Sequence, residues 1–85
     1  MKEKSNFDLE KQYQLYLKRV KLNESTMHPM QRIETKRAFM GACGQILFLF
    51  RDELSELEEN DAVEQMEKMK NQVVQYWNNQ SRGQN

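Results

Sequence analysis

The sequence is poor in the residues that cross-link, bend or interrupt a chain. Its 85 residues include one cysteine, one proline, one histidine and three glycines. The single cysteine, Cys43, excludes an internal disulfide and favours a reducing, intracellular setting. The scarcity of proline and glycine leaves long stretches free to form helices. A domain of this size buries only about 60–65 % of its unfolded surface, so oligomerisation is a common route to stability.

Long apolar runs are also missing. The longest weakly polar stretch, from Ala38 to Phe50, is interrupted by Gln45 and falls short of the ~20 residues that span a bilayer. The first six residues carry charge without an apolar stretch behind them, which is not the pattern of a secretory signal. We therefore expect a cytoplasmic protein with no membrane segment.

Residues suited to catalysis or metal binding are equally sparse. The only imidazole, His28, and the only thiol, Cys43, would lie about 22 Å apart along one helix and could not share a site. Asp52, Glu56 and Glu59 share a helical face that would hold a hard cation only weakly, and the chain has no calcium loop or Glu-x-x-His pair. Without a glycine-rich phosphate loop or a nucleophile–base pair, we expect no enzyme, no cofactor and no metal.

The spacing of apolar residues predicts three helices, at about residues 6–22, 29–59 and 61–77. Ser5 or Asn6 would cap the first helix, and Asp61 with Glu64 would form a capping box for the third. The first helix has one apolar face, made by Leu9, Tyr13, Tyr16, Leu17 and Val20. Residues 78–85 contain no apolar anchor, and we expect them to form a flexible tail.

The predicted central helix carries apolar residues on all sides between Ile46 and Phe50, so it must be covered on all sides. A heptad series indicates a seam for another helix; it comprises Ile33, Met40, Leu47 and Leu54, with Cys43, Phe50 and Leu57 three residues on. Gly41 and Gly44 favour the close approach of a neighbouring backbone or ring. Two tolerated glycines without a packing role are the alternative.

These lengths predict an all-α protein. A central helix of about 45 Å is too long for either flanking helix, of about 25 Å, to cover alone. Short turns then favour an antiparallel three-helix arrangement around one long central helix, forming a single domain over residues 1–85. More apolar groups seek burial than this thin layer can cover, which favours a homodimer; a groove for a partner's helix is the competing interpretation.

Formal neutrality hides a separation of charge. Between Lys11 and Arg37 there are seven basic residues against two acidic ones, whereas Asp52 to Glu67 contains eight acidic residues and no basic one. The basic end can be a solvated surface, a site for an acidic protein, or a nucleic-acid site. A nucleic-acid site would use Lys18, Arg19, Arg32, Lys36 and Arg37. The zero net charge and the long second helix argue against it.

Three segments carry a resemblance: YQLYLKRVKL, MHPMQRIETKRAFMGACGQ and LFRDELSELEE. Together they resemble small, functionally uncharacterised helical proteins of bacterial prophages and other mobile elements, over roughly residues 7 to 77. The resemblance implies an accessory role in a mobile element or its host and supplies no catalytic residue.

The sequence therefore favours a non-enzymatic, homodimeric protein–protein interaction module. The alternative is a nucleic-acid-associated regulator that uses the basic end. The candidate partner-binding residues are Arg32, Lys36, Arg37, Met66, Met69 and Trp77.

Overall fold

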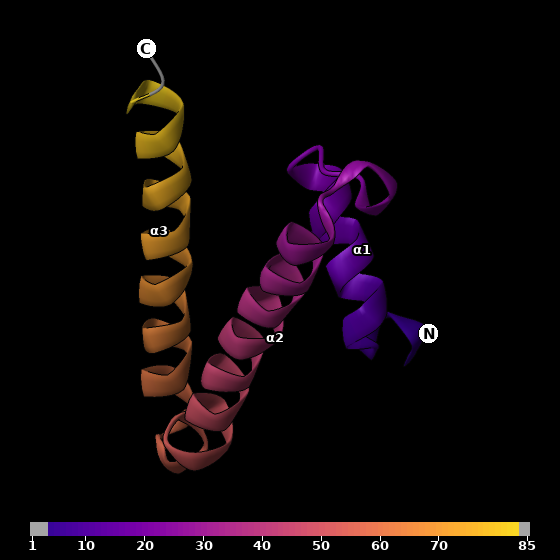
Figure 1. Ribbon diagram of the computed structural model, residues 1–85. Coiled ribbons are helices and arrows are strands. Elements are labelled where there is room, and N and C mark those ends of the chain that lie inside the picture. Colours follow the sequence, from indigo (N-terminus) through magenta and orange to yellow (C-terminus); the bar gives the residue numbers. More distant parts are fainter. Residues whose placement is uncertain (1–3, 84–85) are drawn as a thin grey trace. The chain divides into compact units, whose positions relative to one another are not determined.

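The computed structural model describes residues 4–83 of the chain, and within that range it contains three α-helices and no strand (Figure 1). The helices are α1 (Leu9–Arg19), α2 (Pro29–Asp52) and α3 (Glu59–Gly83), and short 3-10 turns precede them at η1 (Lys4–Phe7), η2 (Glu24–Thr26) and η3 (Leu54–Glu56). The all-α prediction is confirmed. The chain divides into two compact units, Met1–Ile46 and Leu47–Asn85, with the boundary inside α2. The antiparallel arrangement of the three helices stays a prediction.

The first helix is shorter at both ends than the predicted range of 6–22. Its N-cap is Asp8, whose Oδ1 accepts a hydrogen bond of 2.9 Å from the Glu10 backbone N–H. The predicted caps, Ser5 and Asn6, lie in η1 instead. Aspartate in extended backbone is a strong N-cap because its carboxylate also suits the positive end of the helix dipole.

The C-terminus of α1 is closed by a Schellman motif. The Leu22 N–H donates to the Leu17 carbonyl (2.9 Å) and the Lys21 N–H to the Lys18 carbonyl (3.1 Å). This geometry needs a left-handed residue after the cap, and Lys21 adopts it with φ of 61°. A side chain in that region costs free energy that glycine would not. The motif ends the helix and directs the chain toward α2.

The first unit has a small apolar core. Tyr13 and Leu17 of α1 and Met27 from the loop are buried, and Tyr16, Leu22 and Phe39 pack against them. The ring of Phe39, on α2, lies 5.2 Å from the Tyr13 ring and 5.5 Å from the Tyr16 ring, centroid to centroid. Tilted aromatic contacts at this distance add to the free energy of burial. These contacts fasten α1 to the N-terminal half of α2.

One core group lacks a hydrogen bond. Tyr13 is fully buried, and no atom of the described residues pairs with its hydroxyl. Burial, followed by the negative charge of Glu24, raises the pKa of this phenol. A buried hydroxyl without a partner costs about 1–3 kcal/mol, so the ring contributes to stability while the hydroxyl reduces it.

The loop between α1 and α2 has local caps of its own. Asn23 Oδ1 accepts from the Ser25 backbone N–H (2.9 Å) and from the Ser25 hydroxyl (2.7 Å), which fixes η2. The Met30 N–H donates to His28 Nδ1 (3.1 Å), so His28 caps α2 immediately before Pro29. The imidazole thus has a structural role at a helix start, where proline is well tolerated.

The second helix ends at Asp52, and the prediction that it continues to about residue 59 is wrong. The Ser55 hydroxyl donates to the Arg51 carbonyl, which the backbone of a continuing helix would use. The carboxylates of Asp52, Glu53 and Glu56 would also crowd one another at helical spacing, beside the negative end of the helix dipole. Leu54 and Leu57 therefore lie in the connection and do not extend the heptad of α2.

The third helix is longer than predicted at both ends. It begins at Glu59, and the Ala62 N–H donates to the Glu58 carbonyl (2.8 Å), so Asp61 lies inside the first turn and is not the cap. The helix continues to Gly83, so the predicted tail is helical over residues 78–83, and residues 84–85 lie outside the described part of the chain. Glutamine is a good helix former and asparagine a weaker one, but extending an established helix needs no new nucleation.

The two glycines of α2 face open space. A Cβ atom built on Gly41 or Gly44 would meet no atom within 4 Å. The described residues of the first unit therefore do not supply the close neighbour predicted from these glycines. The same stretch exposes Phe48, with 59 % of its surface accessible, beneath the guanidinium of Arg51 at 4.9 Å.

Candidate interaction surface

Three of the predicted partner-binding residues lie together on the N-terminal half of α2. Arg32, Lys36 and Arg37 line a shallow groove with Ile33, Met40 and Glu24. Positions 33 and 40 are one heptad apart, so their side chains share a stripe along the helix. Arg32 and Arg37 stand on either side of that stripe, by their helical spacing. We call these residues the basic groove.

The floor of the basic groove is apolar and open. Ile33 keeps 53 % of its surface accessible, and Met40 is half-buried. The first half of the predicted heptad seam is therefore left uncovered by the unit that contains it. An apolar stripe flanked by cations is typical of a surface that receives an amphipathic helix with acidic residues.

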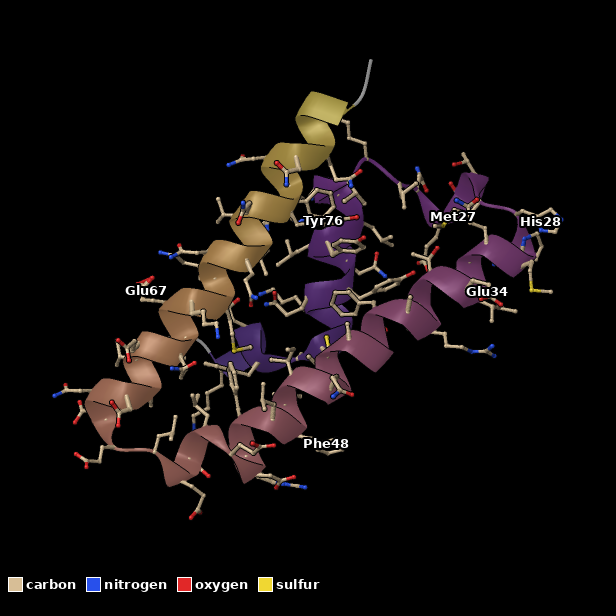
Figure 2. All side chains as sticks on the ribbon, turned by 90° about the vertical axis from the view of Figure 1, so that its left-hand side faces the viewer. Met27, His28, Glu34, Phe48, Glu67 and Tyr76 are labelled. Carbon is tan, nitrogen blue, oxygen red and sulfur yellow. The ribbon has the colours of Figure 1, made fainter. Side chains whose placement is uncertain are left out.

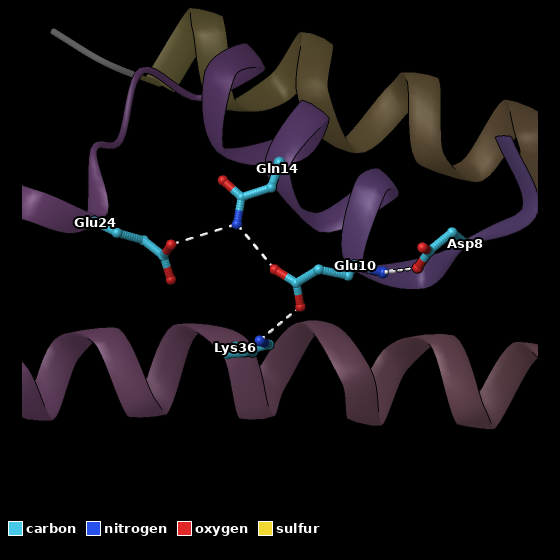
Figure 3. A network of polar contacts seen from close by, with 5 residues as sticks. All are labelled: Asp8, Glu10, Gln14, Glu24 and Lys36. Carbon is cyan, nitrogen blue, oxygen red and sulfur yellow. Dashed lines mark hydrogen bonds and ion pairs between the residues drawn. The ribbon is translucent and has the colours of Figure 1, made fainter. Parts of the chain in front are cut away.

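One cation of the groove is already paired. Lys36 Nζ lies 2.7 Å from Glu10 Oε1 of α1 (Figure 3). The same Nζ lies 5.6 Å from the centroid of the Tyr13 ring. Gln14 Nε2 donates to Glu10 Oε2 (3.0 Å) and to Glu24 Oε1 (3.3 Å). This network connects α1, η2 and α2 at the surface, so Lys36 has a structural role as well as a position on the groove.

The network shifts the ionisation of its members. A hydrogen bond from Lys36, with one from Gln14, lowers the pKa of Glu10. The same bond to Glu10 raises the pKa of Lys36. Both groups are exposed, so water screens the pair and its contribution to stability is small.

The arginines of the groove are more accessible to a partner. Arg37 Nη1 approaches Glu34 Oε1 only to 3.9 Å, with both side chains largely exposed. None of the ion pairs among the described residues involves Arg32. A guanidinium offers five donors in a planar fork that suits carboxylates and phosphates. Arg32 and Arg37 are therefore the groups of the groove best placed to bind an anionic partner.

The other predicted partner-binding residues lie on α3. Met66 and Trp77 keep 46 % and 48 % of their surface accessible, whereas Met69 is half-buried. Tyr76 and Trp77 contact each other edge to face at 5.3 Å. Met66, Met69 and Tyr76 share a face with Ala62 and Val73 by helical spacing. No residue from Leu47 to Gln80 is buried, so the second unit has no core of its own.

The acidic residues surround the start of α3. The segment from Asp52 to Glu67 carries eight carboxylates, and all of these residues are exposed. Glu67 forms an ion pair of 2.8 Å with Lys70. Glu67 and Tyr76 leave opposite sides of α3 (Figure 2). Across the described residues, no three His, Cys, Asp or Glu side chains are grouped to hold a metal ion.

The remaining basic residues of the nucleic-acid hypothesis lie elsewhere. Lys18 and Arg19 occupy the last turn of α1, where cations favour the helix dipole, and Lys18 lines a second shallow groove with Gln14 and Glu24. The sequence pattern does not reveal the roles of Glu10 and Gln14, because a contact between two helices leaves no local signature. Only the opposite charges of Glu10 and Lys36 could have indicated this contact between α1 and α2.

No protein-family model, curated protein or solved structure matches the chain. In residues 4–83, none of the helices combines the length and the apolar character that crossing a membrane requires.

Proposed function

We propose that this chain is a non-enzymatic, all-helical interaction module that acts as a homodimer and binds another protein. Its place would be the cytoplasm, where the lone Cys43 stays reduced. The accessory role in a mobile element rests on the sequence resemblance alone.

The observation that carries this proposal is the amount of apolar surface left uncovered. Large side chains from the centre of α2 and along α3 stay substantially exposed: Ile46, Leu47, Phe48, Val63, Met66, Val73, Val74, Tyr76 and Trp77. Full burial of one such side chain contributes about 1.5–3 kcal/mol. So many exposed large apolar side chains on the helices of one small chain favour an interaction site. A second copy brings an identical apolar surface, which makes self-association the simplest cover.

The alternative function is a nucleic-acid-associated regulator that uses the basic end. The exposed guanidiniums of Arg32 and Arg37 are suited to phosphate contacts. The pairing of Lys36 with Glu10 weighs against it, because that ammonium is already neutralised. A compact acidic partner fits an apolar groove with one arginine unpaired among the described residues, Arg32, and one weakly paired arginine, Arg37, better than a duplex does.

Sedimentation equilibrium of the full chain tests the proposal, first alone and then with a short DNA duplex at two salt concentrations. The proposal predicts a mass of twice the 10.3 kDa of one chain and no change on adding DNA. A complex with DNA that weakens steeply with salt would favour the regulator. A mass of one chain at all concentrations would reject the homodimer.

A further inference from the structure

We infer that the basic groove of α2 receives the acidic segment, residues 52–67, of a second copy of the chain. This inference rests on the proposed homodimer and names its interface. The groove is defined by Arg32, Ile33, Arg37 and Met40 with Lys36 and Glu24 on its rim. The acidic segment comprises η3, the residues on either side of it and the first turns of α3.

Charge is the first argument. Residues 1–46 contain nine lysines and arginines against five acidic residues, a net charge of +4. Residues 47–85 contain four against eight, a net charge of −4. Two copies that bring unlike units together gain attraction at both contacts, whereas bringing like units together costs free energy. Of the arginines that flank the groove, Arg32 takes part in none of the ion pairs among the described residues, and Arg37 approaches Glu34 only to 3.9 Å.

Apolar matching is the second argument. The floor of the groove is the open stripe of Ile33 and Met40. The acidic segment exposes Leu57, Val63 and Met66 between its carboxylates. Each surface therefore has apolar residues among charges, which are basic at the groove except for Glu24 and acidic on the segment. An amphipathic segment in a groove is a recurrent recognition mode.

The distance along α2 favours a second copy as the source of the acidic segment that fills the groove. The second unit joins the start of α3 to the end of α2 through the six residues 53–58. Arg37 and Arg32 lie 15 and 20 residues before Asp52, which is about 22 and 30 Å along α2. Because α2 is one continuous helix, Asp52 at its end stays at that distance from the groove of its own chain. Two copies with antiparallel α2 helices instead place each acidic segment beside the partner's groove.

This arrangement is an isologous dimer with two identical contacts. Near its twofold axis the two α2 helices would cross at their centres, where Gly41 and Gly44 leave open space. Small residues at a crossing allow two backbones to approach closely. The inference thus gives a use to two glycines that meet no neighbour within the described residues of their own unit.

Charge reversal tests the interface directly. Arg32→Glu/Arg37→Glu reverses the two arginines of the groove, and Glu56→Lys/Glu59→Lys lowers the net charge of residues 52–67 from −8 to −4. Each variant alone weakens both contacts, so we expect the dimer dissociation constant to rise on the order of 100-fold for the groove variant and by less for the segment variant. In an equimolar mixture the new lysines of one variant face the new glutamates of the other, and the second contact keeps its wild-type residues, so a heterodimer forms. Native mass spectrometry identifies it because the two variants differ in mass.

Two controls separate the interface from general charge and folding effects. Lys18→Glu/Arg19→Glu changes the charge of the first unit by the same amount outside the groove, and it should remain a homodimer. The chain that carries all four substitutions, Arg32→Glu/Arg37→Glu/Glu56→Lys/Glu59→Lys, should dimerise again. This result would show that the substitutions do not prevent folding. Circular dichroism of each variant checks that helix content is retained.

The outcomes distinguish this inference from the proposed function. Dimers that persist in both reversal variants would overturn the interface while the homodimer stands. Monomeric variants that fail to associate when mixed would place the contact within one chain and overturn docking between copies. A wild-type chain that is monomeric would reject the proposed function itself.

Discussion

The two units of this chain differ in how much each buries for itself. The first unit closes a small core around Tyr13, Leu17 and Met27 and fastens α1 to α2 with a surface network. The second unit buries none of its residues between Leu47 and Gln80, although α3 carries a regular apolar face. Both units have the same helical spacing of apolar residues. The comparison shows that such spacing identifies a face that needs cover and does not identify what covers it.

The largest expected effect tests the core of the first unit. Leu17→Ala should reduce the free energy of unfolding by about 2–5 kcal/mol, because it leaves a cavity beside Tyr13 and Phe39. Urea denaturation followed by circular dichroism measures the change. Leu15→Ala, on the exposed side of the same helix, is the matched control and should cost under about 1 kcal/mol. Equal losses in the two variants would contradict the proposed core.

Removing the unpaired hydroxyl should stabilise the same core. Tyr13→Phe keeps the aromatic contact with Phe39 and removes a group whose burial costs about 1–3 kcal/mol. We expect the free energy of unfolding to rise by about 1 kcal/mol in the same urea experiment. Tyr16→Phe, at a half-buried position, should change it little. A clear loss of stability in Tyr13→Phe would mean that the hydroxyl has a partner in solution.

Replacing Lys21, the left-handed residue of the Schellman motif, should increase stability by a similar amount. Lys21→Gly should stabilise the first unit by about 1 kcal/mol, because glycine adopts the φ of 61° without the steric cost of a Cβ. Thermal unfolding would show this as a higher Tm. The same change inside α1, Lys18→Gly, should lower the Tm, since glycine weakens a helix interior. A lower Tm in both variants would argue against a left-handed Lys21.

The smallest expected effect is the pH dependence of the stabilisation that the Glu10–Lys36 ion pair provides. The folded-state pKa of Glu10 lies below its ordinary value of 4.5, so its stabilisation is present above that value and is lost as the pH falls through the lowered pKa. Lys36 behaves oppositely: its pKa is raised above 10.5, so its stabilisation is lost only as the pH rises through the raised value. An NMR titration should show the pKa of Glu10 returning upward in Lys36→Met. An unchanged pKa would exclude the ion pair.

The positions of the three helices could be predicted from the sequence. The apolar spacing found all three helices and the face of α1 that carries Tyr13 and Leu17, because local spacing reports local structure. The residues at which the helices begin and end were predicted less accurately. The early end of α2 depends on the Ser55 hydroxyl and on crowded carboxylates, which interrupt an apolar pattern that by itself continues to Leu57.

The candidate interaction residues were predicted as two groups, and the structure shows what each group consists of. Arg32, Lys36 and Arg37 were found from charge, but the pairing of Lys36 with Glu10 joins residues of two helices and has no sequence signature. Met66 and Trp77 were predicted as partner-binding residues from the apolar pattern, and they stay exposed within their own unit. A local pattern identifies such a face without indicating what would cover it.

Amide hydrogen exchange at several protein concentrations tests the central claim most directly. The account predicts that protection of α1, around Tyr13 and Leu17, is independent of concentration, because the first unit has its own core. Protection of α3 around Met66 should rise with concentration, because a second copy covers its apolar face. Protection of α3 that is the same at every concentration would contradict the claim that a second copy covers the second unit.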